Sequence, residues 1–198
     1  MQHLFLSIYF AAVVTEMLIR FPFEKIRRRR KRIRRQVPPA EWLVLILLFL
    51  GMFFLPLAYA LTPWLRFADY RWPPAAHAVA GVLGSAALLF ALWLFWRAHR
   101  DLAADWSPSL EVFEGHRLVT EGIYGVIRHP MYASQVAWAI GQTLLLRNWI
   151  AGPASLVALL PLFLVRIPQE ERMLVQHFGD DYRLYCERTG RIVPRRRQ

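Results

Sequence analysis

Two polar stretches on either side of an apolar hairpin decide how this chain folds. The first reads GIYGVIRHPMY at residues 122–132, and the second reads RIPQEERMLVQHFGDDYRLY at residues 166–185. Between them lie two apolar runs, 131–146 and 149–165, with a two-residue polar turn at their junction. Each run has about the minimum length of a membrane span. A helical hairpin of these runs returns the second polar stretch to the level of the first, so both should lie on one side of a membrane.

The composition points to a membrane protein with one basic side. Hydrophobic residues make up 56% of the 198-residue chain, yet its formal net charge is +11. These values agree only if apolar and basic residues occupy separate segments. Such a charge is also typical of nucleic-acid binding, but the length of the apolar segments requires lipid first, so we expect no nucleic-acid partner. The length allows one domain, and a single cysteine, Cys186, excludes an intramolecular disulfide.

The apolar segments predict an all-α integral membrane protein with about five transmembrane helices in one domain, residues 1–198. A span needs about 17–25 apolar residues, or fewer when the helix is packed in a hairpin. The expected spans are 4–20, 41–61, 75–96, 131–146 and 149–165.

The distribution of basic residues predicts the orientation. Nine Lys or Arg fall within residues 25–35, directly after the first span. This segment should stay in the cytoplasm and contact anionic lipid headgroups. With five spans, the inner segments hold 22 basic residues and the outer ones hold only Arg66, Arg71 and Arg147. The C-terminal polar region should therefore face the cytoplasm.

Two features of the predicted spans have alternative interpretations. Glu16 lies inside the first span, where a carboxylate is costly and marks a functional site by default. It could instead form an interfacial pair with Arg20 at i+4. The third span repeats small residues at helical spacing, including Gly81 and Gly84, which allows close helix packing within one chain or between two.

The polar stretches contain groups suited to a zwitterionic ligand. Pro130 favours a helix start, and the free N–H groups there, beside His129, suit an anion such as a carboxylate. Glu170 and Glu171 follow Pro168 and should occupy the first turn of an amphipathic helix. Each element also has a purely structural explanation, as a membrane anchor or as acids that favour a helix dipole. The hairpin brings them together, and acids beside a basic helix start predict a binding site.

The motifs over about residues 115–194 closely resemble the isoprenylcysteine carboxyl methyltransferase family. They are His116-Arg-Leu118-Val119-Thr120, Gly122-Ile-Tyr124, Arg128-His129-Pro130-x-Tyr132, Trp138-x-Ile140-Gly141-Gln142-Thr143 with Asn148, and Arg166 to Glu171 followed by Leu174, Phe178-Gly179, Tyr182 and Tyr185. The resemblance implies an integral membrane fold that binds S-adenosylmethionine on the cytosolic side and admits a lipidic or prenylated substrate between its spans. Ala133-Ser134 and Pro168 depart from the usual pattern, and the N-terminal part has no evident match.

The resemblance also implies the roles of individual residues. The cofactor would be bound by His116, Leu118, Val119, Gly122, Tyr124, Arg128, His129, Tyr132, Gln142, Glu170 and Glu171. Arg166, Arg128 and Glu170 would take part in catalysis, with one of the arginines orienting the acceptor. No metal is expected, because the histidines lack ligand spacing.

The expected reaction is carboxyl O-methylation of an isoprenylcysteine-like lipid. A carboxylate is ionised near neutral pH and needs no general base, whereas an amine acceptor would need one, with His129 or Glu170 as candidates. Three alternatives stay open: a phospholipid or amine N-methyltransferase, an NADPH-dependent sterol-type reductase on a related scaffold, and a lipid-binding scaffold without activity.

Overall fold

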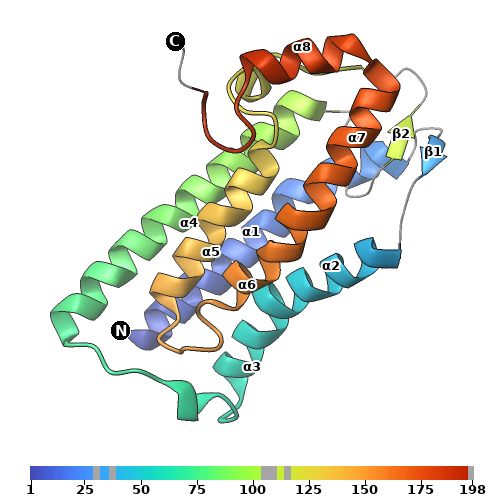
Figure 1. Ribbon diagram of the computed structural model, residues 1–198. Coiled ribbons are helices and arrows are strands. Elements are labelled where there is room, and N and C mark those ends of the chain that lie inside the picture. Colours follow the sequence, from blue (N-terminus) through green and yellow to red (C-terminus); the bar gives the residue numbers. More distant parts are fainter. Residues whose placement is uncertain (29–31, 36–38, 104–110, 114–116, 196–198) are drawn as a thin grey trace.

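The computed structural model is a bundle of long helices that run side by side, with shorter helices across one end (Figure 1). It describes residues 1–28, 32–35, 39–103, 111–113 and 117–195. The helices are α1 (Gln2–Arg28), α2 (Pro39–Phe49), α3 (Leu55–Leu61), α4 (Pro74–Leu102), α5 (Pro130–Leu145), α6 (Ala154–Pro161), α7 (Ile167–Phe178) and α8 (Asp180–Arg188). Two short antiparallel strands, β1 (Arg32–Arg35) and β2 (Glu111–Phe113), pair near the end that carries α8. Short 3₁₀ turns span Arg66–Ala68 and Gly122–Gly125.

The helical class predicted from the sequence is confirmed. Among the described residues, three helical segments are long and apolar enough to cross a membrane by length and composition: Gln2–Arg28, Trp42–Leu61 and Pro74–Leu102. They correspond to the first three predicted spans, 4–20, 41–61 and 75–96. Large apolar side chains such as Val82, Leu89 and Leu164 point outward on the bundle. Outward-facing apolar surface on this scale is suited to contact with lipid.

The small residues of α4 are used for packing within one chain. α4 crosses α5 at Gly84 and Gly141, where a Cβ on either glycine would lie 2.9–3.0 Å from the carbonyl oxygen of the other. Gly81 similarly lies against the ring of Phe5 on α1. Small side chains let helix backbones approach closely, and this contact is the main source of association between helices in lipid. α4 and α5 therefore form the closely packed central helix pair of the bundle.

Two of the prolines that lie inside helical rods, Pro56 and Pro168, follow a π-helical turn. The π turn Leu50–Phe54 joins α2 to α3 before Pro56, and the π turn Leu162–Arg166 joins α6 to α7 before Pro168. A proline cannot donate to the carbonyl four residues earlier and clashes with it, and the i→i+5 geometry of a π turn moves that carbonyl. Consequently α7, which we expected as a separate helix after Pro168, continues directly from the apolar α6.

Candidate functional site

Helices α1, α4, α5 and α8 and the α2–α3 and α6–α7 rods line one cavity of about 450 Å³ between the bundle core and the end that carries α8. On four of them the lining residues recur at helical spacing: Val13, Glu16, Met17 and Arg20 on α1, Leu45, Leu48, Phe49, Met52 and Phe53 on the α2–α3 rod, His129, Tyr132, Gln135 and Trp138 at the start of and along α5, and Leu162, Arg166, Glu170, Met173 and Leu174 on the α6–α7 rod. Residues three or four apart share a helix face, so each helix contributes one stripe. The volume is within the range of small-ligand sites.

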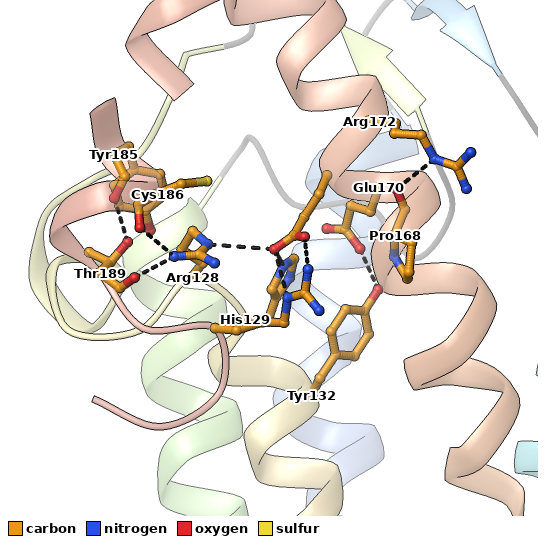
Figure 2. A network of polar contacts seen from close by, with 11 residues as sticks. Arg128, His129, Tyr132, Pro168, Glu170, Arg172, Tyr185, Cys186 and Thr189 are labelled. Atoms are coloured by element: carbon orange, nitrogen blue, oxygen red, sulfur yellow. Dashed lines mark hydrogen bonds and ion pairs between the residues drawn. The ribbon is translucent and has the colours of Figure 1, made fainter. Parts of the chain in front are cut away.

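The polar half of the cavity contains a chain of hydrogen bonds between α5 and α7. The Tyr132 hydroxyl donates to Glu170 Oε2 and accepts from Arg166 Nε at 3.0 Å. Figure 2 shows the Tyr132 ring reaching from α5 toward Glu170 on α7. Arg166 is 6% exposed although it is charged, and it lines the cavity. A buried guanidinium offers several donors in a planar fork, a geometry that matches a carboxylate.

Glu171 faces away from the cavity and joins three basic groups. Its carboxylate lies 3.2 Å from His129 Nε2 and 3.5 Å from Arg128 Nε, and it also accepts two bonds from Arg191. Burial alone would raise the pKa of Glu171, but the hydrogen bonds from His129 and Arg191 outweigh it and hold the pKa at about 2. Glu171 is therefore ionised across the physiological range and fixes His129, which is 4% exposed and lines the cavity.

Arg128 fastens the start of α5 to the segment 186–191, which we call the C-terminal strap. Its Nη1 donates to the carbonyl oxygens of Cys186 and Thr189 (Figure 2). Its backbone N–H donates to the carbonyl oxygen of Gly190 at 2.8 Å. The backbone N–H of the next residue, His129, donates to Arg191 at 2.9 Å. These bonds occupy much of the Arg128 guanidinium, so Arg128 holds the start of α5 in place.

The turn Gly122–Gly125 brings Tyr124 into the cavity wall. Gly122 has φ +61°, and a Cβ there would lie 2.3 Å from the Asp101 carboxylate. Asp101 accepts from the backbone N–H of Ile123 at 2.8 Å and is itself bound by Arg97 Nε at 3.0 Å. Only glycine fits this left-handed position beside a carboxylate. Tyr124 is 7% exposed, and burial raises the pKa of its hydroxyl well above the ordinary value.

The structure brings most of the predicted site residues to the cavity. Leu118, Val119, Tyr124, Arg128, His129, Tyr132, Arg166 and Glu170 line it. Gly122 and Glu171 support it from outside, and His116 lies outside the described residues.

Gln142 does not line the cavity. It follows Tyr132 on α5 by nearly three turns, about 15 Å of helix rise. Its amide donates to the carbonyl oxygens of Gly51 at 2.8 Å and Ala151 at 2.7 Å, and its oxygen accepts from Tyr9 at 2.8 Å. These bonds tie three segments of the bundle together, which is a structural role.

Comparisons with known proteins agree with this geometry. The sequence profile of the isoprenylcysteine carboxyl methyltransferase (ICMT) family matches residues 82–176, from the middle of α4 to α7. The match covers a little less than half of the chain and shows that this segment is similar to the ICMT family. It includes the start of α5, Arg166 and both glutamates, so much of the polar lining of the cavity comes from the matched segment.

Individual curated relatives match part of the chain. Protein-S-isoprenylcysteine O-methyltransferase B of Arabidopsis thaliana is 42% identical over 81 residues, which cover 41% of this chain and 41% of that protein. Protein-S-isoprenylcysteine O-methyltransferase of Homo sapiens is 29% identical over 140 residues, covering 68% of this chain and 49% of the human protein. The chain thus spans less than half the length of these curated relatives.

One solved structure is similar in sequence and only partly in shape. The structure of the eukaryotic intramembrane Ras methyltransferase ICMT aligns at 28% identity over 78% of this chain and 50% of that chain. Its TM-score of 0.42 is too low to establish a shared arrangement of helices.

Several further residues line the cavity. Glu16 on α1 was considered either as a functional group or as a partner of Arg20, whereas Arg20 itself, His99 on α4 and Gln135 on α5 were not predicted as site residues, and all four line the cavity. One signal was present for Gln135, because positions 129, 132, 135 and 138 repeat every three residues from the predicted helix start. For the residues of α1 and α4, no spacing in the sequence indicates which face meets α5.

Proposed function

We propose that this chain is an integral membrane methyltransferase that transfers a methyl group from S-adenosylmethionine to the carboxylate of an isoprenylcysteine-like lipid. The proposal rests chiefly on one observation, the mixed lining of the cavity. Its wall combines the charged groups of Glu170 and Arg166 and buried aromatic side chains with apolar residues such as Leu48 and Phe49. A charged cofactor and a prenyl chain each find a matching surface in it.

The residues at the polar end fit the chemistry of S-adenosylmethionine. Tyr124, Tyr132 and His129 offer aromatic faces for an adenine ring, with the rings of His129 and Tyr132 5.4 Å apart and nearly parallel. Glu170 supplies a carboxylate that can accept from hydroxyl or ammonium groups. Leu118 and Val119 add apolar contact. The cofactor would supply a methyl group made electrophilic by a sulfonium.

The protein's main contribution to the reaction is alignment and exclusion of water. Arg166, held by Tyr132, would hold one oxygen of the acceptor carboxylate and leave the other directed at the methyl group. In-line transfer forms an O–CH₃ bond and breaks an S–CH₃ bond, and the electron pair stays on sulfur. A positive and a negative group become neutral, so apolar surroundings favour the transfer, and no proton moves. A general base is unnecessary.

The apolar wall and the basic segments support a lipidic acceptor taken from the membrane. Leu45, Leu48, Phe49, Met52 and Phe53 lie on successive turns of the α2–α3 rod and face the cavity. A chain entering along this wall would reach the polar end from the bilayer core. The charge bias predicted from the sequence would place that end in the cytoplasm, with five spans completed by α5 and the α6–α7 rod.

Calorimetric titration of S-adenosylhomocysteine into detergent-purified protein tests cofactor binding. We expect Glu170→Gln to weaken binding roughly tenfold or more, because a charge-assisted hydrogen bond contributes about 1.5–3 kcal/mol. Asp180→Asn is a matched control, since the Asp180 side chain is 85% exposed. Binding of NADPH in place of S-adenosylhomocysteine would refute the proposal.

Transfer of labelled methyl groups to S-farnesylcysteine tests the reaction. The expected product is an ester, which releases methanol on treatment with base. A base-stable methylated product would show that nitrogen is the acceptor, and would contradict carboxyl methylation.

A further inference from the structure

A carboxyl group lies on the cavity wall outside the matched segment. Glu16 is on α1, and residues 82–176 are the segment that the ICMT profile matches. Ionisable side chains inside a span are costly and usually serve a function. None of the steps above uses Glu16, although it faces the same space as Arg166 and Glu170. The position of Glu16 relative to Arg166 and Glu170 indicates which part of a bound molecule it can contact.

Glu16 contacts α5 one helical turn away from the residue that binds Arg166. Its Oε1 accepts from Gln135 Nε2 at 3.3 Å, and Gln135 follows Tyr132 by three residues on the same face of α5. Three residues correspond to a rise of about 4.5 Å. Tyr132 is bonded to Arg166 at 3.0 Å, so Glu16 and Arg166 are linked through two neighbouring side chains of α5.

Glu16 has room for further donors. Gln135 supplies one long hydrogen bond, and Arg20, one turn later on α1, attracts the carboxylate electrostatically. The two oxygens of a carboxylate offer about four acceptor positions. A donor group of a bound molecule in the cavity can therefore be accommodated without breaking either interaction.

The acceptor of the proposed reaction carries such a donor beside its carboxylate. In a cysteine derivative the carboxyl carbon and the nitrogen are attached to the same carbon atom. When Arg166 holds the carboxylate, the nitrogen must lie within a few ångströms of it. A negative or hydrogen-bond-accepting group one turn away is then placed for the N–H and not for the carboxylate.

We propose that Glu16 is a specificity residue that binds the α-nitrogen of the methyl acceptor, as Arg166 binds its carboxylate. This inference rests on the proposed function. The nitrogen has two possible sources, the ammonium of a free prenylated amino acid and the amide of a prenylated peptide. Both present N–H to Glu16, whereas only the ammonium adds a charge.

Three acceptors with the same prenyl chain test the proposal in the 198-residue protein. S-farnesylcysteine has an ammonium, N-acetyl-S-farnesylcysteine has an amide, and S-farnesyl-3-mercaptopropionic acid has no nitrogen. For Glu16→Ala we expect KM to rise about tenfold for the two acceptors that contain nitrogen. KM for the nitrogen-free acid should change less than threefold. Glu16→Gln separates the two sources of nitrogen. A rise in KM that is confined to S-farnesylcysteine identifies the ammonium as the bound group, and wild-type KM values for both nitrogen-containing acceptors identify the amide.

The controls distinguish failure of this inference from failure of the proposed function. Glu24→Gln removes an acid from the same helix outside the cavity and should change no KM value. Both Glu16 variants should bind S-adenosylhomocysteine like the wild type, which shows that they are folded. An equal rise in KM for all three acceptors, or none in Glu16→Ala, would overturn the role of Glu16. Absence of methyl transfer to every acceptor by the wild-type protein would overturn the proposed function and this inference with it.

Discussion

Replacement of Gln142 by alanine should destabilise the protein and leave cofactor affinity intact. Gln142 is fully buried and makes hydrogen bonds to Tyr9, Gly51 and Ala151. Hydrogen bonds between helices in membranes contribute about 0.6 kcal/mol each on average, so three contribute roughly 2 kcal/mol. The carbonyl groups left behind are buried, which adds to the loss.

The assay is the thermal unfolding midpoint in detergent together with titration of S-adenosylhomocysteine. For a chain of this size, about 2 kcal/mol corresponds to a decrease of roughly 4–8 °C. The dissociation constant should stay within twofold of the wild-type value. Gln176→Ala is the matched control, because Gln176 is exposed on α7. A tenfold loss of affinity with an unchanged midpoint would refute the structural role and return Gln142 to the cofactor site.

Three further predictions test the scaffold around the site. Gly141→Leu should force α4 and α5 apart at Gly84 and cost about 1–3 kcal/mol, measured as a lower unfolding midpoint; an unchanged midpoint would mean that the crossing is not tight. Because the pKa of Glu171 is about 2 in the fold and near 4.5 otherwise, its contribution to stability is complete above about pH 5 and declines toward pH 2. The midpoint of the wild type should thus fall more steeply with acidification than that of Glu171→Gln, and parallel curves would contradict this. Arg128→Lys should loosen the C-terminal strap and speed proteolysis near Gly190 at least severalfold, whereas an unchanged cleavage rate would show that backbone bonds alone hold it.

The sequence predicted those features that depend on the order and length of segments. Alternation of polar and apolar stretches indicated the helical bundle, and the two short apolar runs indicated a hairpin. The hairpin in turn predicted that Glu171 would return to Arg128 and His129, and the structure places its carboxylate 3.5 Å and 3.2 Å from them. Contacts of this kind are predictable because a hairpin of two helices of similar length brings its two ends to the same level.

Features that depend on how helices are rotated against each other were not predictable. Spacing shows that Glu16 and Arg20 share a face of α1, but the direction of that face depends on packing against α5. Gln142 was expected at the cofactor because the resemblance includes it, although its hydrogen bonds lie deeper in the bundle. The π turns before Pro56 and Pro168 were also not predictable. They depend on the hydrogen bond that a proline N–H cannot donate and on the packing of the helical segments before and after the turn.

The C-terminal strap sets an order of events during biogenesis. Residues 186–191 are synthesised after every helix that they brace, yet Arg128 and His129 depend on their carbonyl groups. The apolar helices can therefore enter the membrane and pair before the ligand-binding end has its final shape. Until the strap has left the ribosome, the apolar helices of a nascent chain can be packed together while the start of α5 still lacks its bonds to the strap. Competence to bind should thus be acquired late and in a single step, after α1 to α7 have been synthesised.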